Sequence, residues 1–173
     1  MGAYTYLVNA FSNTFSEWQK MGSSPYLNAV DAPANFVRRA SGANKRIGYF
    51  DFQDSGAEKA ETLDRVYLEL YLRASDDPET GFPSLKAFVY NGQSWTAFNI
   101  PADSLFWAWK TVDVTSVIDC WEKVDGCRVY LQATCGTDAW VEVDCMKIKA
   151  STVAGESLRT SFGDGLTWVM LNV

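Results

Sequence analysis

The chain has 173 residues, of which 47% are apolar and 21% are charged, and it carries a net charge of −6 with a pI near 4.6. This composition is typical of a globular protein, and the acidic balance argues against nucleic acid as the main partner. Apolar runs stay short of the roughly 20 residues that a membrane helix needs, so we expect no membrane insertion. The first residues also lack the basic start and apolar middle of a signal peptide.

The chain contains no histidine, and this restricts the chemistry it can perform. Ser-His-Asp triads, Cys-His dyads and histidine-ligated zinc sites all require that residue type. Carboxylates are plentiful, but no spacing selects a pair of them for glycosidase-type chemistry. We therefore expect a protein that is not an enzyme and that needs no cofactor for catalysis.

The first third of the sequence alternates between short strand-like runs and turn residues. Ala3 to Ala10 reads as an apolar strand, and Phe11, Phe15 and Trp18 then recur at the spacing of a short helix or turn. Gly, Ser, Pro and Asn residues mark the chain reversals that follow. The strands expected here cover residues 26–30, 35–39 and 47–53, with turns at 31–33 and 41–44.

Residues 62–73 carry the clearest strand pattern of the chain. One parity holds Val66, Leu68, Leu70 and Leu72, and the other holds Arg65, Tyr67, Glu69, Tyr71 and Arg73. Side chains alternate across a strand, so this pattern predicts one buried face and one solvated face. A strand of this kind belongs to an antiparallel sheet that packs against a second layer.

The second half of the chain continues with strands and tight turns. Asn91-Gly92 is a strong hairpin signal between strands 85–90 and 94–100, and an acidic loop at 74–83 precedes it. After the strand 105–112, Asp113 caps a helical turn that is expected to end at Asp125-Gly126. We then expect a hairpin of strands 127–135 and 140–149 around residues 136–138, a linker at 150–157 and a terminal strand at 166–173.

Four cysteines raise the question of disulfides. None of them forms a CxxC pair, so a zinc site is poorly supported. Cys120 and Cys127 close a short loop and are the pair that we expect to bridge, which would imply an oxidising compartment. For Cys135 and Cys145 the alternative is that they are small buried apolar residues.

Taken together, the strands predict an all-β fold, namely an antiparallel jelly-roll β-sandwich with one or two short helices. We expect a single domain over residues 1–173, with its core at about 12–149 and a C-terminal linker and strand at 150–173. One set of residues spread along the chain forms a further pattern: Trp18, Gly22, Pro25-Tyr26-Leu27, Asp31, Phe50-Asp51-Phe52, Thr62-Leu63, Val66, Trp109, Asp113-Val114-Thr115, Trp121 and Val143-Asp144. In this pattern the sequence resembles the galactose-binding-like jelly rolls, the fold of carbohydrate-binding modules.

The resemblance implies a glycan site built on exposed aromatic rings. The candidates are Tyr67 and Tyr71 on the polar face of the strand at 62–73, with Trp95 and Trp107 further along the chain. Core packing is the favoured alternative for Trp107 and Trp109, and cross-strand pairing on a covered face is the alternative for the two tyrosines. Asp31 and Asp144 match the general positions of a structural calcium site, although capping or hairpin roles suit them equally.

Two functions from different classes follow. The first is a non-enzymatic carbohydrate-binding or surface-adhesion module, with a glycan as its partner. The second is a structural subunit of a virion, filament or surface layer, because the apolar strands at both ends of the chain are able to pair with neighbouring copies in a homo-oligomer. Either function would place the protein outside cells or on a virion surface.

Overall fold

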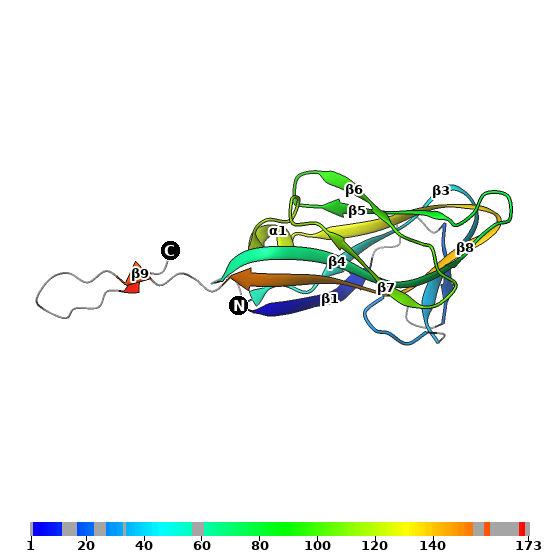
Figure 1. Ribbon diagram of the computed structural model, residues 1–173. Coiled ribbons are helices and arrows are strands. Elements are labelled where there is room, and N and C mark those ends of the chain that lie inside the picture. Colours follow the sequence, from blue (N-terminus) through cyan, green and yellow to red (C-terminus); the bar gives the residue numbers. More distant parts are fainter. Residues whose placement is uncertain are drawn as a thin grey trace, which may run out of the picture.

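The computed structural model describes residues 2–11, 17–22, 27–32, 34–56 and 61–153, together with the backbone of 158–159 and 170–171. It confirms the all-β class, with strands as the dominant element and one short helix in the described part of the chain (Figure 1). The elements are β1 (Ala3–Phe11), β2 (Gln19–Met21), β3 (Phe36–Phe52), β4 (Thr62–Ser75), β5 (Ser84–Tyr90), β6 (Trp95–Ile100), β7 (Ala108–Asp113), α1 (Trp121–Asp125), β8 (Arg128–Val153), β9 (Leu158–Arg159) and β10 (Met170–Leu171).

The antiparallel strands form the two layers of a jelly-roll β-sandwich. In one layer, which we call the β5 layer, β6 pairs with β5, β5 with the first half of β8, and that half with the end of β3. In the other, the β4 layer, β7 pairs with β4, and β4 with the second half of β8. β1 pairs with both β8 and β3, so this N-terminal strand is paired inside the domain.

Two long strands pass from one layer to the other. β3 and β8 stay paired from Val37–Val143 to Asp51–Arg128, with register shifts around Gly42. Figure 1 shows β8 leaving in the β5 layer (yellow) and returning in the β4 layer (orange). The predicted hairpin of 127–135 and 140–149 is therefore wrong, because the two halves of β8 enter different layers and do not pair with each other. The predicted separation of β3 into two strands is wrong for the same reason, since β3 also continues from one layer into the other.

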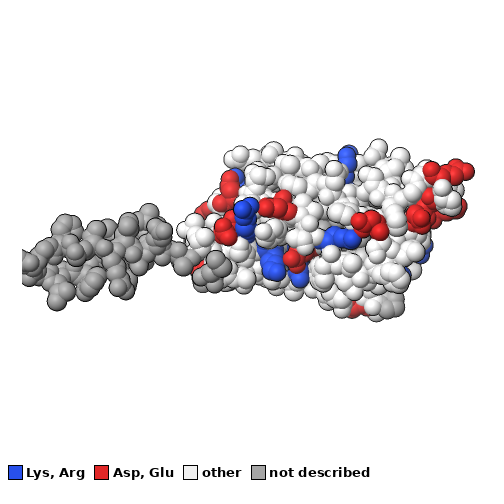
Figure 2. Space-filling view, in the orientation of Figure 1, with Lys and Arg blue, Asp and Glu red and all other residues white. Residues whose placement is uncertain are grey.

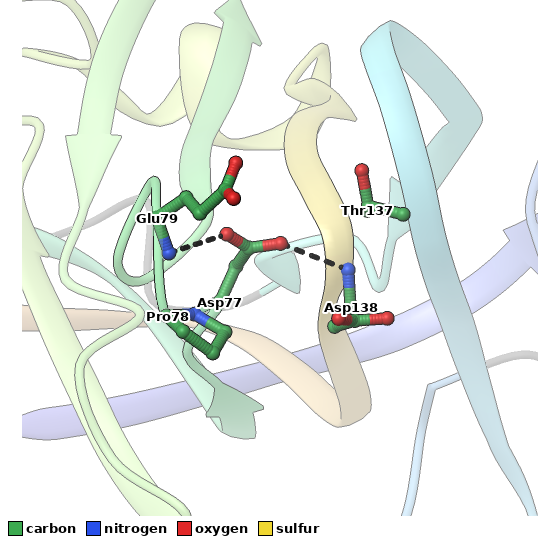
Figure 3. A pocket seen from close by; sticks show the side chains of 5 residues that line it. All are labelled: Asp77, Pro78, Glu79, Thr137 and Asp138. Carbon is green, nitrogen blue, oxygen red and sulfur yellow. Dashed lines mark hydrogen bonds between the residues drawn. The ribbon is translucent and has the colours of Figure 1, made fainter.

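Hydrogen bonds of the Asp77 side chain connect the corner between β4 and β5 to this bend of β8. The backbone N–H groups of Glu79 and Thr80 donate to one oxygen of the Asp77 carboxylate, and that of Asp138 donates to the other, each at 2.9 Å (Figure 3). These three donors hold the pKa of Asp77 down to about 2. A Cβ atom at Gly136 would lie 2.8 Å from the Asp77 carboxyl carbon, so glycine allows the corner to approach β8.

The core lies between the layers and confirms the face predicted for the strand at 62–73. Val66, Leu68, Leu70 and Leu72 of β4 are fully buried. They belong to one cluster with side chains from β3, β5 and both halves of β8. The other parity of β4 is directed away from this core, so its side chains form part of the outer surface of the β4 layer.

The predicted disulfide is wrong, because all four cysteines are free. Cys120 precedes α1 and Cys127 follows it, and at about 1.5 Å of rise per helical residue the helix holds them further apart than the roughly 7 Å limit for a bridge. Burial raises the pKa of the Cys127 thiol to about 12 and that of Cys145 to about 11. Both thiols therefore stay protonated at neutral pH and pack as small apolar groups.

Two smaller expectations also change, and two others fall mostly outside the described residues. β8 continues to Val153, so the predicted linker at 150–157 begins as strand. The segment 26–30 contributes an isolated bridge from Asn28 to Cys145 rather than a strand among its described residues. Most of the predicted terminal strand at 166–173, and residues 12–16 of the predicted first helix or turn, lie outside the described residues.

Among the helices of the described residues, none has the length and apolar character needed to span a membrane.

Candidate functional site

Three aromatic rings gather on the outer surface of the β4 layer. Tyr71 of β4 is paired with Trp109 of β7, and their ring centroids are 5.3 Å apart. Trp107, two residues earlier in the sequence, stacks on Tyr71 at 5.5 Å with an interplanar angle of 19°. Trp109 keeps 39% of its surface exposed. We call these three residues the aromatic platform.

The loop before β7 places further apolar side chains at the margin of the platform. The Ser104 carbonyl accepts the backbone N–H of Ala74, which extends the pairing beyond β7. The Ser104 hydroxyl in turn accepts the backbone N–H of Phe106. Phe106 is 82% exposed and Leu105 is 53% exposed. The platform therefore continues into a projecting apolar loop.

Basic side chains lie over the indole rings. The Nζ atom of Lys147 is 3.8 Å from the ring centroid of Trp109, and the guanidinium of Arg73 is 4.9 Å from that of Trp107. Arg73 also lies over Trp140, which carries Arg38 at 5.0 Å. Cations and rings thus alternate across neighbouring strands, an arrangement that fixes the orientation of the indoles.

Two carboxylates accompany these cations. Glu142 is 1% exposed and binds Arg73 at 2.6 Å and Arg38 at 3.4 Å. Glu69 lies 3.2 Å from Lys147 and 3.8 Å from Lys149. Figure 2 shows basic and acidic side chains interspersed over the face of the molecule that is in view. The platform therefore combines aromatic rings with charged hydrogen-bonding groups that lie over and beside them.

The structure separates the four aromatic residues proposed from the sequence. Tyr71 and Trp107 meet in the platform. Tyr67 lies on the same face but four residues earlier on β4, about 13 Å along the strand, beside Asp113 and Lys149. Trp95 belongs to the β5 layer. Trp109 is exposed and Trp107 is half-buried, with an edge contact to Phe36. Neither residue belongs to the buried core cluster, so core packing, the favoured alternative for both, is wrong.

Trp95 instead helps to form a concavity on the outer surface of the β5 layer, which we call the hairpin pocket. It is lined by Tyr49, Tyr90, Trp95 and Arg128 and has a volume of about 330 Å³. The Trp95 ring lies 5.3 Å from that of Tyr49 and 5.0 Å from that of Tyr90. The ring planes of these two pairs are inclined to each other by 35° and 34°, so the aromatic wall is concave.

Asp31 and Asp144, the calcium candidates, lie side by side. The backbone N–H of Asp31 donates to both carboxylate oxygens of Asp144, at 3.1 and 3.4 Å. Burial raises the pKa of Asp144 to about 6, and the neighbouring Asp31 carboxylate adds to the rise. Asn35 donates to Asp31. In the part of the chain that the structure describes, no group of three or more His, Cys, Asp or Glu side chains is arranged to hold a metal ion.

Several residues of these surfaces were missed by sequence reasoning. Trp109 was detectable, because it shares the parity of Trp107 in the predicted strand 105–112. Lys147 and Glu142 lie in the second half of β8. The sequence predicted that this half pairs with residues 127–135, whereas in the structure it pairs with β4, so the neighbours of these two residues were not predicted. Tyr49 and Arg128 gave no local signal, since β3, β6 and β8 bring them to Trp95 only through pairing between strands distant in sequence.

Neither the family models nor the curated proteins yield a match to this chain. Among solved structures, it is similar to a family 61 carbohydrate-binding module in complex with β-1,4-galactotriose, at 11% identity and a TM-score of 0.45, covering 80% of this chain and 86% of that one. A family 35 module from Paenibacillus barcinonensis has 13% identity and a TM-score of 0.43, covering 88% of this chain and all of that one.

A third similar structure is the family 30 module of a cellulosomal cellulase from Clostridium thermocellum. Its identity is 9% and its TM-score 0.45, with 86% of this chain and 97% of that chain covered. At such low identities and TM-scores, the similarity to these carbohydrate-binding modules concerns the general arrangement of the jelly roll and says nothing about a ligand of this chain.

Proposed function

We propose that this protein is a non-catalytic carbohydrate-binding module that holds a neutral glycan on the aromatic platform. The observation that carries the proposal is the grouping of Tyr71, Trp107 and Trp109 on an outer sheet face, with Trp109 39% exposed. One face of a pyranose ring presents mainly C–H groups, which pack well on an aromatic ring, while its hydroxyls need hydrogen-bond partners at the rim.

The charged border supplies those partners. Glu69 offers acceptors, and Lys147 and Arg73 offer donors next to the rings. Each platform carboxylate is already engaged by two cations. This engagement suits hydrogen bonding to a neutral ligand.

The test is affinity gel electrophoresis against a panel of soluble neutral polysaccharides. We expect at least one of them to retard the protein. Trp109→Ala removes the most exposed ring of the platform and should weaken binding by roughly 30-fold, as expected for an interface residue worth about 2 kcal/mol. Trp95→Ala, on the opposite layer, is the matched control and should bind normally.

Two results would contradict the proposal. One is the absence of retardation by every polysaccharide. The other is a Trp109→Ala variant that melts at the normal temperature and binds as well as the unchanged protein. Glycan binding outside cells, including adhesion to a surface, is the setting that the proposal implies. Self-pairing through β1 is not part of it, because β1 is paired inside the domain.

Calcium at Asp31 and Asp144 stays a prediction. Calcium takes 6–8 oxygen ligands, whereas the Asp144 oxygens here already accept a backbone N–H and the described donor set is small. These residues therefore do not fit a complete site by themselves. A melting temperature that rises in millimolar CaCl2 relative to EDTA, and no longer rises in Asp144→Asn, would establish the ion.

A further inference from the structure

The hairpin pocket is a second concave aromatic surface, on the opposite outer face from the platform. We propose that it binds a single sugar ring that carries a carboxylate, such as a terminal uronic acid residue. Its volume of about 330 Å³ is at the lower end of the range for small-molecule sites, roughly 300–1,000 Å³. A site of this size suits one or two pyranose rings.

The aromatic wall of the pocket is held in place from behind. Trp95 packs against Tyr130 at 4.9 Å, and Tyr130 is stacked on Phe88 at 4.5 Å with an interplanar angle of 7°. The Tyr90 hydroxyl donates to the Gly92 carbonyl, which fixes the Tyr90 ring beside the turn. These rings are ordered before a ligand arrives, so little side-chain freedom remains to be lost on binding.

β3 approaches the wall closely because of one glycine. Gly48 has a φ of +128°, and a Cβ atom there would lie 2.8 Å from the Cα and Cβ atoms of Tyr130. The backbone conformation and the close approach both favour glycine. Tyr49, the next residue, thereby reaches the ring of Trp95.

Among the described residues that line the pocket, Arg128 is the one that carries a charge. Its Nε atom donates to Asp51 at 2.7 Å, which orients the guanidinium. The two terminal nitrogens of a guanidinium carry four further N–H donors in a planar fork. That fork matches a carboxylate, which it binds through two parallel hydrogen bonds.

The chemistry of the pocket thus differs from that of the platform. On the platform, each carboxylate is shared by two cations beside the rings. In the pocket, the side chain of Arg128 is 56% exposed at the edge of an aromatic wall, and Arg46 lies over Tyr130 behind it. A ligand with one flat apolar face and one negative group can pack on the aromatic rings and bind Arg128 at the same time.

The experiment compares two matched sugars by titration calorimetry at low salt. Methyl β-D-glucuronide carries a carboxylate where methyl β-D-glucoside carries a hydroxymethyl group. Hydrogen bonds to a charged group are stronger than those between neutral groups, so we expect the glucuronide to bind at least about tenfold more tightly. Added salt should weaken that preference.

Variants identify the site. Arg128→Gln should bring the glucuronide down to the affinity of the glucoside, and Trp95→Ala should abolish the tighter binding of the glucuronide. Trp109→Ala, on the platform, should bind the glucuronide as the unchanged protein does. The side chain of Arg128 is 56% exposed, so Arg128→Gln should melt at nearly the normal temperature. It still tests the charge if Trp95→Ala, which loses packing against three tyrosine rings, is unstable.

The proposal is overturned if neither sugar binds, if the two bind equally, or if Arg128→Gln retains the preference for the glucuronide. Loss of binding in Trp109→Ala would also overturn it, by placing the sugar on the platform. The result is independent of the proposed function, because that proposal depends on neutral polysaccharides and on Trp109.

Discussion

Glu142 is the residue on which the outer face of the β4 layer depends most directly. Its carboxylate is 1% exposed, although it lies on the outer parity of β8, because Arg73 and Arg38 cover it. A buried carboxylate is costly unless it is paired. The same two guanidiniums lie over Trp107 and Trp140, so one buried charge orders two indole rings.

Replacing Arg73 should lower the free energy of unfolding more than replacing Glu142. Arg73→Met leaves Glu142 buried with the single, longer contact to Arg38, and we expect it to cost about 3 kcal/mol or more of unfolding free energy. Glu142→Gln leaves two arginines that can reach water, and we expect about 1 kcal/mol. Urea unfolding measures both. An equal or reversed order would show that Glu142 is not held as a buried charge.

At the scale of elements, the corner between β4 and β5 decides how the two layers are joined. The Asp77 carboxylate receives three backbone N–H groups, two from its own turn and one from β8. Charge-assisted hydrogen bonds of this kind favour the ionised carboxyl group. The corner and the bend in β8 are thus connected by a single side chain (Figure 3).

Because of this connection, the free energy of unfolding should depend on pH. The pKa of Asp77 in the folded chain, about 2, lies below its ordinary value of 3.8. The unfolded state therefore takes up the proton first, and the contribution of Asp77 is complete above about pH 4 and is lost as the pH falls from about 4 to about 2. We expect Asp77→Asn to be less stable than the unchanged protein at neutral pH.

The difference between the two proteins should then shrink as the pH falls through that window. Urea unfolding at a series of pH values measures it, and comparison with the variant cancels the titration of the other carboxylates. Two curves that run parallel from about pH 5 to pH 2 would mean that the Asp77 hydrogen bonds do not stabilise the corner.

At the scale of the whole molecule, the two candidate surfaces lie on opposite outer faces of the sandwich. The platform belongs to β4 and β7, and the hairpin pocket to β3, β5, β6 and β8. With the core between them, one short glycan segment cannot reach both. If both proposals hold, a single copy of the protein joins two separate polysaccharide chains.

Such joining is measurable by light scattering. A soluble polysaccharide with uronic acid groups on a neutral backbone should scatter more strongly when the protein is added, because each copy links two chains. Either Trp109→Ala or Trp95→Ala should remove the increase while leaving binding at the other face. A protein that binds the polysaccharide through both faces without any rise in scattering would contradict joining.

The sequence by itself determined the all-β class and the two faces of β4. Both follow from local alternation: a period of two leaves Val66, Leu68, Leu70 and Leu72 with one common direction, whatever the rest of the fold. The hairpin signal at Asn91-Gly92 was also local. Residues 91–94 connect β5 to β6, Gly92 has a φ of +90°, and the Asn91 side chain accepts the N–H groups of Gln93 and Ser94.

Only the tertiary structure decided where strands change layer and which aromatic residues meet. Gly42 and Gly136 gave correct signals of reversal, but a turn signal does not reveal whether the two segments pair with each other or enter opposite layers. That choice depends on pairing with β4 and β5 and on a shared core. The same pairing joins Tyr71 to Trp109 and brings Trp95 to Tyr49, so both candidate sites are consequences of contacts that no local pattern encodes.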